Sequence, residues 1–70
     1  MARHFYKAAK NDGRARIECL HVRFWSEWFV FISFGGIFDR IGGFKCLKDA
    51  EEWLLGCDSN FYEVASERDW

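Results

Sequence analysis

The chain contains no proline, no low-complexity run and no stretch with the composition of a linker. Nothing therefore marks a domain boundary, and 70 residues suit a single domain with one core. No apolar run approaches the roughly 18 residues that a membrane-spanning helix requires. Residues 1–7 lack the apolar stretch and the small-residue cleavage site of a signal peptide. We expect one cytosolic domain, residues 1–70, without a membrane partner.

Cysteine is scarce, and Cys19, Cys46 and Cys57 form no CxxC pair. Their odd number does not suit a disulfide framework. A structural zinc site needs a tetrahedral set of ligands, usually delivered in close pairs. Cys19 and His21 offer one loose pair, and the spacing of the other thiols provides no second one. We therefore predict reduced, mostly buried thiols, no bound metal and no cofactor.

Histidine is also scarce, with only His4 and His21. No Ser/His/Asp, Cys/His/Asn or paired-carboxylate pattern can be placed from the spacing. The pairs Gly35–Gly36 and Gly42–Gly43 are not followed by the lysine and hydroxyl of a phosphate-binding loop. A core of this size also gives little support to a catalytic constellation or a ligand-sized pocket. These absences predict a protein that is not an enzyme.

Charge is unevenly distributed along the chain, although the net charge is only −1. Residues 1–25 have a balance of +4, and residues 26–70 have a balance of −5. If the fold keeps these charges apart, the domain has a basic end that attracts acidic or nucleic-acid surfaces. If the fold interleaves them, they form a mutually compensating surface.

Aromatic side chains, in contrast, make up 20% of the chain, and seven of them lie between Phe24 and Phe38. A domain of this size buries only about 60% of the surface that its unfolded chain exposes. Part of the aromatic cluster should therefore face a partner. Protein interfaces are enriched in Trp, Tyr and Arg. The candidate partner-binding residues are Tyr6, Arg14, Arg16, Trp25 and Trp28.

Within this set, Trp25 and Trp28 flank an expected turn at Ser26–Glu27 and are the candidate exposed anchors. Tyr6 and the two arginines would add polar contacts. The alternative is that both tryptophans close a small core at the edge of the sheet.

Several short segments have the character of strands. Asn11-Asp12-Gly13 is a turn signal between a strand at His4–Ala8 and a longer one at Arg14–Phe24, although the second segment also fits a helix. Trp28–Phe34 is apolar on both faces. A single helix can cover only one of these faces. The other must be shielded by the chain ends or by a partner, which includes a second copy of the chain.

The C-terminal half combines a short strand with a helix. The two glycine pairs bracket a strand at Ile37–Ile41 with bends or bulges at its ends. From Leu47 to Leu55 the apolar period becomes helical, and Trp53 belongs to the buried stripe. For Phe61–Arg68 a helix is favoured over an edge strand, because Asn60 and Glu63 have the spacing of a capping box. The expected fold is α+β: an antiparallel sheet of about four strands, one main helix on one face, and a short C-terminal helix as an option.

The segment Phe44–Gly56 resembles the strand-into-helix unit of compact phage anti-CRISPR proteins that block type I surveillance complexes. The matching positions are Phe44, Ala50, Glu51, Trp53 and Gly56. The resemblance implies an antiparallel sheet with two helices. It also implies a non-enzymatic inhibitor that binds a subunit of a Cas surveillance complex and blocks it sterically, in the cytoplasm of an infected bacterium. The binding residues of that family lie outside the matched segment, so none is transferred to this chain.

A single-stranded nucleic-acid-binding domain is the alternative function. Such proteins stack bases on sheet aromatics next to cations, and Trp28–Phe34 together with the basic N-terminal half offers both. The net charge of −1 opposes this function, because neutralisation of phosphates dominates such binding. A homodimer through the uncovered face of the sheet is compatible with either function.

Overall fold

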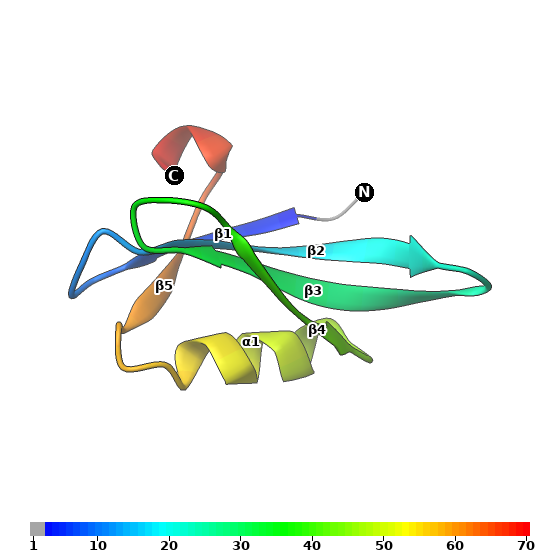
Figure 1. The fold of residues 1–70 in the computed structure, drawn as a ribbon. Coiled ribbons are helices and arrows are strands. Elements are labelled where there is room, and N and C mark those ends of the chain that lie inside the picture. Colours follow the sequence, from blue (N-terminus) through cyan, green and yellow to red (C-terminus); the bar gives the residue numbers. More distant parts are fainter. Residues whose placement is uncertain (1–2) are drawn as a thin grey trace.

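The structure is a computed structural model that describes residues 3–70 (Figure 1). Within these residues, five strands form one antiparallel sheet in the order β4-β3-β2-β1-β5, and one α-helix packs against it. The elements in chain order are β1 (Arg3–Ala8), β2 (Arg14–Val22), β3 (Trp25–Ser33), β4 (Asp39–Phe44), α1 (Leu47–Leu55), β5 (Phe61–Val64) and the 3-10 turn η1 (Glu67–Asp69). The predicted α+β class is confirmed, with five strands in place of about four.

The turn between β1 and β2 lies where Asn11-Asp12-Gly13 predicted it. The side-chain oxygen of Asn11 accepts a hydrogen bond of 2.8 Å from the backbone N–H of Gly13. Gly13 is buried, and a Cβ atom there would approach this oxygen to 2.7 Å. The side chain of Asn11 thus replaces a backbone partner, and the absence of a side chain at Gly13 lets the turn close.

The β2–β3 turn differs from the expectation. The strand form of residues 14–22 is confirmed over the helix, but β2 ends at Val22 and the turn is Arg23–Phe24. The predicted turn at Ser26–Glu27 is wrong, because both residues pair with β2 inside β3. Arg23 has a φ of 59°, a left-handed conformation that Gly, Asn or Asp usually supplies.

Strand β4 spans Asp39–Phe44, so the expected strand at Ile37–Ile41 was placed too close to the N-terminus at both of its ends. Gly42–Gly43 lies inside the strand and forms the bulge that the glycine pair predicted. Trp28 pairs with Phe44 and Phe29 pairs with Gly42, which leaves Gly43 as the extra residue. A Cβ atom at Gly43 would collide with the side chain of Glu27.

Helix α1 has the predicted bounds, and its Ala50 and Leu54 are fully buried. Gly56 ends the helix, and its N–H donates to the carbonyl of Glu52 at 3.1 Å. The prediction that Trp53 is a core residue is wrong, since 39% of its surface is exposed. Its ring lies at the side of the helix, 6.4 Å from the ring of Phe44.

The segment after α1 is a strand and not the favoured helix. β5 pairs with β1, and the carboxylate of Glu63 lies 3.0 Å from Nδ1 of His4 in β1. Asn60 has a φ of 54° and turns the chain into the strand. The short C-terminal helix is present only as the turn η1. α1 and η1 lie on opposite sides of the sheet (Figure 1).

The core lies between the sheet and α1. Alternate residues of the strands supply it, as the period of two predicts. Its buried members are Tyr6, Ala8, Ala15, Ile17, Val30, Ile32, Ala50, Leu54 and Phe61. Helix α1 lies along this face of the sheet (Figure 1), and we refer to it as the α1 face.

Candidate functional site

The opposite face of the sheet, which we call the open face, consists of alternate residues of the four strands β1 to β4. Cross-strand pairing places Phe5, Arg16, Phe31 and Arg40 in one row. The rows on either side complete the open face, whose members are Arg3, Phe5, Lys7, Arg14, Arg16, Glu18, Phe29, Phe31, Ser33 and Arg40. Five of these ten residues are cations and one is an acid.

Arginine side chains cover the aromatic rings of the open face. The guanidinium carbon of Arg16 lies 4.3 Å from the ring centroid of Phe31 and 5.2 Å from that of Phe38. Arg40 lies 5.4 Å from the ring centroid of Phe29. Phe29 is only 9% exposed. The arginine stems remove the rings from water while the charged heads stay at the surface.

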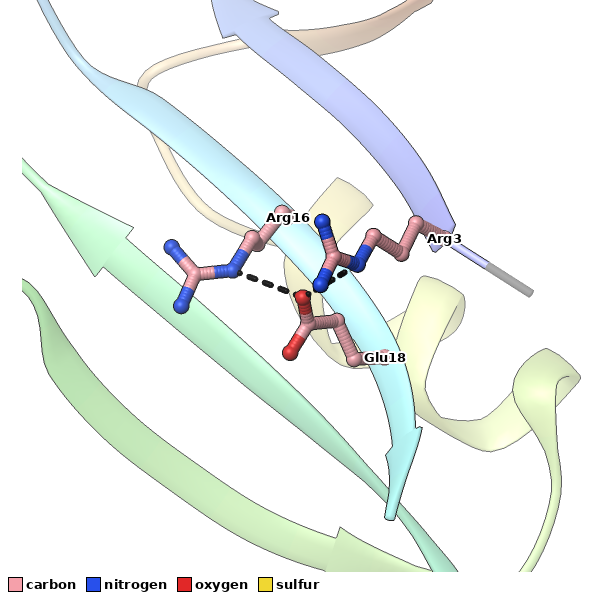
Figure 2. Close-up of polar contacts among 3 residues, drawn as sticks. All are labelled: Arg3, Arg16 and Glu18. Atoms are coloured by element: carbon pink, nitrogen blue, oxygen red, sulfur yellow. Dashed lines mark hydrogen bonds and ion pairs between the residues drawn. The ribbon is translucent and has the colours of Figure 1, made fainter. Parts of the chain in front are cut away.

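Glu18 holds two of these arginines in place (Figure 2). Its Oε1 accepts a hydrogen bond of 3.1 Å from Arg16 Nε and forms an ion pair with Arg3, whose Nε lies 2.9 Å away. The side chain of Glu18 is 8% exposed, so this carboxylate is buried with two charged partners. The contact orients Arg16 over Phe31, because a guanidinium is planar and its hydrogen-bonding directions are fixed.

The uneven charge of the chain therefore becomes a basic face. Four of the five cations come from β1 and β2, and Arg40 comes from β4. Within residues 3–70, Lys7, Arg14 and Arg40 form no ion pair. On the other side of the sheet, α1 carries Asp49, Glu51 and Glu52. The separation is partial, because η1 with Glu67 and Asp69 lies on the open side of the sheet.

The C-terminal end covers the β1 side of the open face. The ring of Trp70 lies 5.0 Å from that of Phe5 and 5.5 Å from that of Phe38. Its Nε1 donates a hydrogen bond of 3.0 Å to the carbonyl of Tyr6. The expected shielding of the second face thus comes from a chain end and from arginines, within one copy of the chain.

The β2–β3 hairpin projects beyond the rest of the sheet (Figure 1). β1 pairs with β2 no further than Glu18, and β4 pairs with β3 only from Trp28 onward. We call the two-stranded projection, residues 20–27, the hairpin end. Phe24 is 97% exposed at its turn, and the adjacent Trp25 is 52% exposed. The indole N–H of Trp25 donates to the carboxylate of Glu27.

The five predicted site residues do not form one surface. Arg14 and Arg16 lie on the open face, and Trp25 is exposed on the hairpin end. Trp28 lies on the α1 face, half-buried against the core, with its ring 6.3 Å from that of His4. The pairing of Trp25 and Trp28 as anchors is wrong for Trp28, because residues three apart in a strand point to opposite faces.

Tyr6 is a core residue and not a partner contact. It is 1% exposed, and its hydroxyl donates a hydrogen bond of 2.7 Å to Glu51 Oε2 in α1. Burial, followed by this hydrogen bond and the charge of Glu51, raises the pKa of the Tyr6 hydroxyl far above its usual value. The contact ties β1 to the helix.

Several residues of the candidate surfaces were missed from the sequence. Phe24 was assigned to a strand, and its exposure follows only from the true position of the turn. Arg40 was expected inside a strand, but its position beside Phe29 and Phe31 arises from the pairing of β4 with β3 and has no local signal in the sequence. Trp70 carried no local signal, because its contacts with Phe5 and Tyr6 join opposite ends of the chain.

A cleft of about 390 Å³ lies where the β1–β2 turn, β5 and the C-terminal end meet. Its lining consists of Lys7, Ala8, Asn11, Asp12, Gly13, Arg14, Tyr62 and Trp70. The expectation concerned a pocket enclosed by the core, and this cleft is not such a pocket. The cleft lies at the surface and takes its walls from loops and chain ends, so the small core does not limit it.

The thiols and the remaining chemistry-bearing groups are dispersed. All three cysteines are free, but Cys46 is exposed and the other two are half-buried, so the prediction of mostly buried thiols is wrong. Burial raises the pKa of the Cys57 thiol.

Among residues 3–70, no three His, Cys, Asp or Glu side chains gather as metal ligands. The same part of the chain contains no helix of the length and apolarity that crossing a membrane requires.

Comparison with known proteins returned no match to a family model, to a curated protein or to a solved structure. The similarity of residues 44–56 to anti-CRISPR proteins therefore rests on the pattern of that segment alone.

Proposed function

We propose that the protein is a non-enzymatic inhibitor that binds a partner protein with its hairpin end and blocks that partner by occupying its surface. The observation that carries this proposal is the exposure of Phe24, at 97%, and of Trp25, at 52%, on a two-stranded projection. Neither side chain belongs to the core. Exposed aromatic residues gathered at one place are typical of interaction sites.

The hairpin end has the properties of an interface centre. An aromatic side chain buries about 150–250 Å² when it enters a pocket, and a standard interface buries about 800 Å² on each partner. Phe24 and Trp25 would supply a large part of that area, and the half-buried Leu20 and Val22 would extend it. Arg23 and the cations of the open face would form the charged rim and speed the encounter with an acidic partner.

For the identity of the partner, we propose a subunit of a bacterial CRISPR surveillance complex, met in the cytoplasm of an infected host. The similarity of residues 44–56 to anti-CRISPR proteins supports this class of partner. Steric occlusion requires only binding, which agrees with the dispersed arrangement of the titratable side chains.

The test is a nuclease-treated pull-down of the tagged protein from lysate of a CRISPR-bearing bacterium, read by mass spectrometry. The variant Phe24→Ser removes the most exposed ring of the hairpin end. The matched control is Ile37→Ser, because Ile37 is 90% exposed but lies in the β3–β4 loop. We expect wild type and Ile37→Ser to recover a stoichiometric surveillance complex and Phe24→Ser to recover at least about tenfold less. Recovery of no complex, or equal recovery by all three proteins, would contradict the proposal.

Single-stranded nucleic-acid binding through the open face is a second candidate, and the uncompensated cations Lys7, Arg14 and Arg40 favour it. Stacking of bases on the rings is restricted, because guanidinium groups already cover Phe29 and Phe31. The test is the affinity for a fluorescent oligonucleotide at increasing salt. A steep loss of binding between about 50 and 200 mM salt, unchanged in Phe24→Ser, would support this function.

A homodimer through the open face is opposed by charge. A two-fold interface would place each basic face against its copy, and like charges brought together cost several kcal/mol. The hairpin end is the better surface for a second copy, and the apparent mass of wild type and Phe24→Ser in sedimentation experiments would show whether it is used.

A further inference from the structure

The cleft beside Trp70 goes beyond the proposed function, because it lies on β1 and β5 and shares no residue with the hairpin end. Its volume of about 390 Å³ lies within the range of small-molecule sites, about 300–1,000 Å³. Cross-strand pairing aligns Tyr62, Lys7 and Arg14 in one row at its floor. The cleft therefore combines one exposed aromatic ring with two neighbouring cations.

The two cations are available to a ligand. Within residues 3–70, neither Lys7 nor Arg14 forms an ion pair. Arg14 is nevertheless held in place: its Nε donates a hydrogen bond of 3.1 Å to the main-chain oxygen of Trp70, and its guanidinium carbon lies 4.9 Å from the ring centroid. The Nη groups of Arg14 are left to donate elsewhere. Asp12 is the acidic side chain in the lining, so the side chains of the cleft carry one more positive than negative charge.

The two aromatic side chains of the cleft, Trp70 and Tyr62, differ in how firmly other residues hold them. Trp70 is fixed by its hydrogen bond to the carbonyl of Tyr6 and by the ring of Phe5 at 5.0 Å. Tyr62 is 48% exposed and presents its ring to solvent next to Lys7. A wall that is already ordered lowers the entropic cost of binding. An exposed ring beside it gains most from a flat ligand that covers it.

From this geometry we propose that the cleft binds a nucleotide, with its phosphate on Lys7 and Arg14 and its base against Tyr62. A phosphate matches the forked donors of an arginine and the charge of a lysine. A base matches an exposed ring, because every base has a flat aromatic face. The same chemistry comes from two sources, a free nucleotide or one nucleotide of a single strand that continues over Arg16 and Arg40.

The test is a titration of the full chain with AMP, adenosine, inorganic phosphate and a five-nucleotide oligodeoxynucleotide. Binding is followed by NMR through the indole N–H of Trp70 and the amide of Tyr62. We expect saturable shifts with AMP and much weaker binding of adenosine and of phosphate alone. An absence of shifts with AMP would overturn the proposal. Phosphate that binds as tightly as AMP would overturn the assignment of the base to Tyr62.

Three variants locate the ligand. Arg14→Gln should weaken AMP binding at least about tenfold, and Tyr62→Ala should weaken it several-fold. Arg40→Gln is the control, because Arg40 lies on the same basic face but outside the cleft. It should leave AMP binding unchanged. Equal losses in Arg14→Gln and Arg40→Gln would mean that AMP binds to the basic face in general and would overturn the proposal.

The oligonucleotide separates the two sources. An affinity at least about tenfold above that of AMP at the same salt, reduced by Arg40→Gln, identifies a strand as the source. Equal affinities identify a free nucleotide. Phe24→Ser should bind AMP like wild type, so failure at the cleft and failure at the hairpin end are separate results.

Discussion

On the α1 face of the sheet, Ile17 and Val30 are covered by a second layer of structure, the helix with Ala50 and Leu54. On the open face, Phe29 and Phe31 are covered by the side chains of single arginines. Both arrangements bury apolar surface. The helix does so with apolar side chains only, whereas the arginines keep their charged heads in contact with water.

The difference shows how a domain of 70 residues closes a second sheet face without a second layer. Each arginine over a ring contributes about 0.5–2 kcal/mol and remains able to attract an anionic surface. On the open face the same residues therefore stabilise the fold and present charge to the solvent, whereas the buried residues of the α1 face only stabilise the fold. The following changes test this distinction.

The largest effect should come from the α1 face. Leu54 is fully buried, so Leu54→Ala should lower the free energy of unfolding by about 2–5 kcal/mol through lost burial and the cavity left behind. Leu55→Ala is the matched control, since Leu55 is 52% exposed, and it should change stability by no more than about 0.5 kcal/mol. Urea denaturation measures both. Similar losses in the two variants would mean that α1 packs on the sheet through another stripe.

A smaller loss should follow from a change at the centre of the open face. Glu18→Gln keeps the shape of the side chain but removes the charged acceptor of Arg3 and Arg16, which should cost about 1–3 kcal/mol. Glu52→Gln, on the exposed side of α1, is the control and should be nearly neutral. Urea denaturation at two salt concentrations is the measurement. A neutral Glu18→Gln would show that the arginines cover the rings without this anchor.

Tyr6→Phe should lower stability by about 0.5–1.5 kcal/mol at neutral pH, because the hydrogen bond to Glu51 is lost. Its effect should also depend on pH. The folded state raises the pKa of Tyr6 above the ordinary tyrosine value of 10.0, so the native protein retains a proton that the unfolded chain loses. The stabilisation is complete below pH 10 and decreases as the pH rises further.

The measurement for Tyr6 is the free energy of unfolding of wild type and Tyr6→Phe from pH 7 to 11. The difference between them should shrink above the ordinary tyrosine pKa. Tyr62→Phe is the control, because Tyr62 is 48% exposed. A constant difference across this range would contradict a raised pKa at Tyr6.

The smallest effect on stability should come from the hairpin end. Phe24→Ala removes a ring that is 97% exposed, and the midpoint of urea unfolding should move by the equivalent of no more than about 0.5 kcal/mol. The same variant should lose partner binding. A large loss of stability would mean that Phe24 packs inside the protein, and it would remove the basis of the proposed interface.

The sequence predicted those elements of the fold that depend on interactions between residues close together in the chain. The period of residues 47–55 predicted the bounds of α1, and Asn11-Asp12-Gly13 predicted the first turn. The turn at Arg23–Phe24 was not predictable in this way, because Arg23 adopts a left-handed φ that its residue type does not announce. β5 was mistaken for a helix, since its pairing with β1 outweighs a local capping pattern.

The prediction of the candidate site depended on the predicted positions of the turns. A misplaced turn changes which aromatic residues are at the end of a hairpin and which lie inside a strand. For this reason Trp28 was expected next to Trp25, although the two residues lie on opposite faces. Arg14 and Arg16 lie on the open face because they alternate with the buried Ala15 and Ile17, and their contact with a partner stays a prediction.

The strand order also has a consequence for folding kinetics. Strands β1 to β4 are joined by consecutive hairpins, whereas β5 pairs with β1. The pair of Ala8 and Phe61 therefore closes a long loop that contains β2, β3, β4 and α1. Closing this long loop is slower than forming hairpins. β5 and Trp70 should therefore join the sheet last and exchange their amide hydrogens first. The cleft exists only when that step is complete, so a bound nucleotide would slow the first opening event of the molecule.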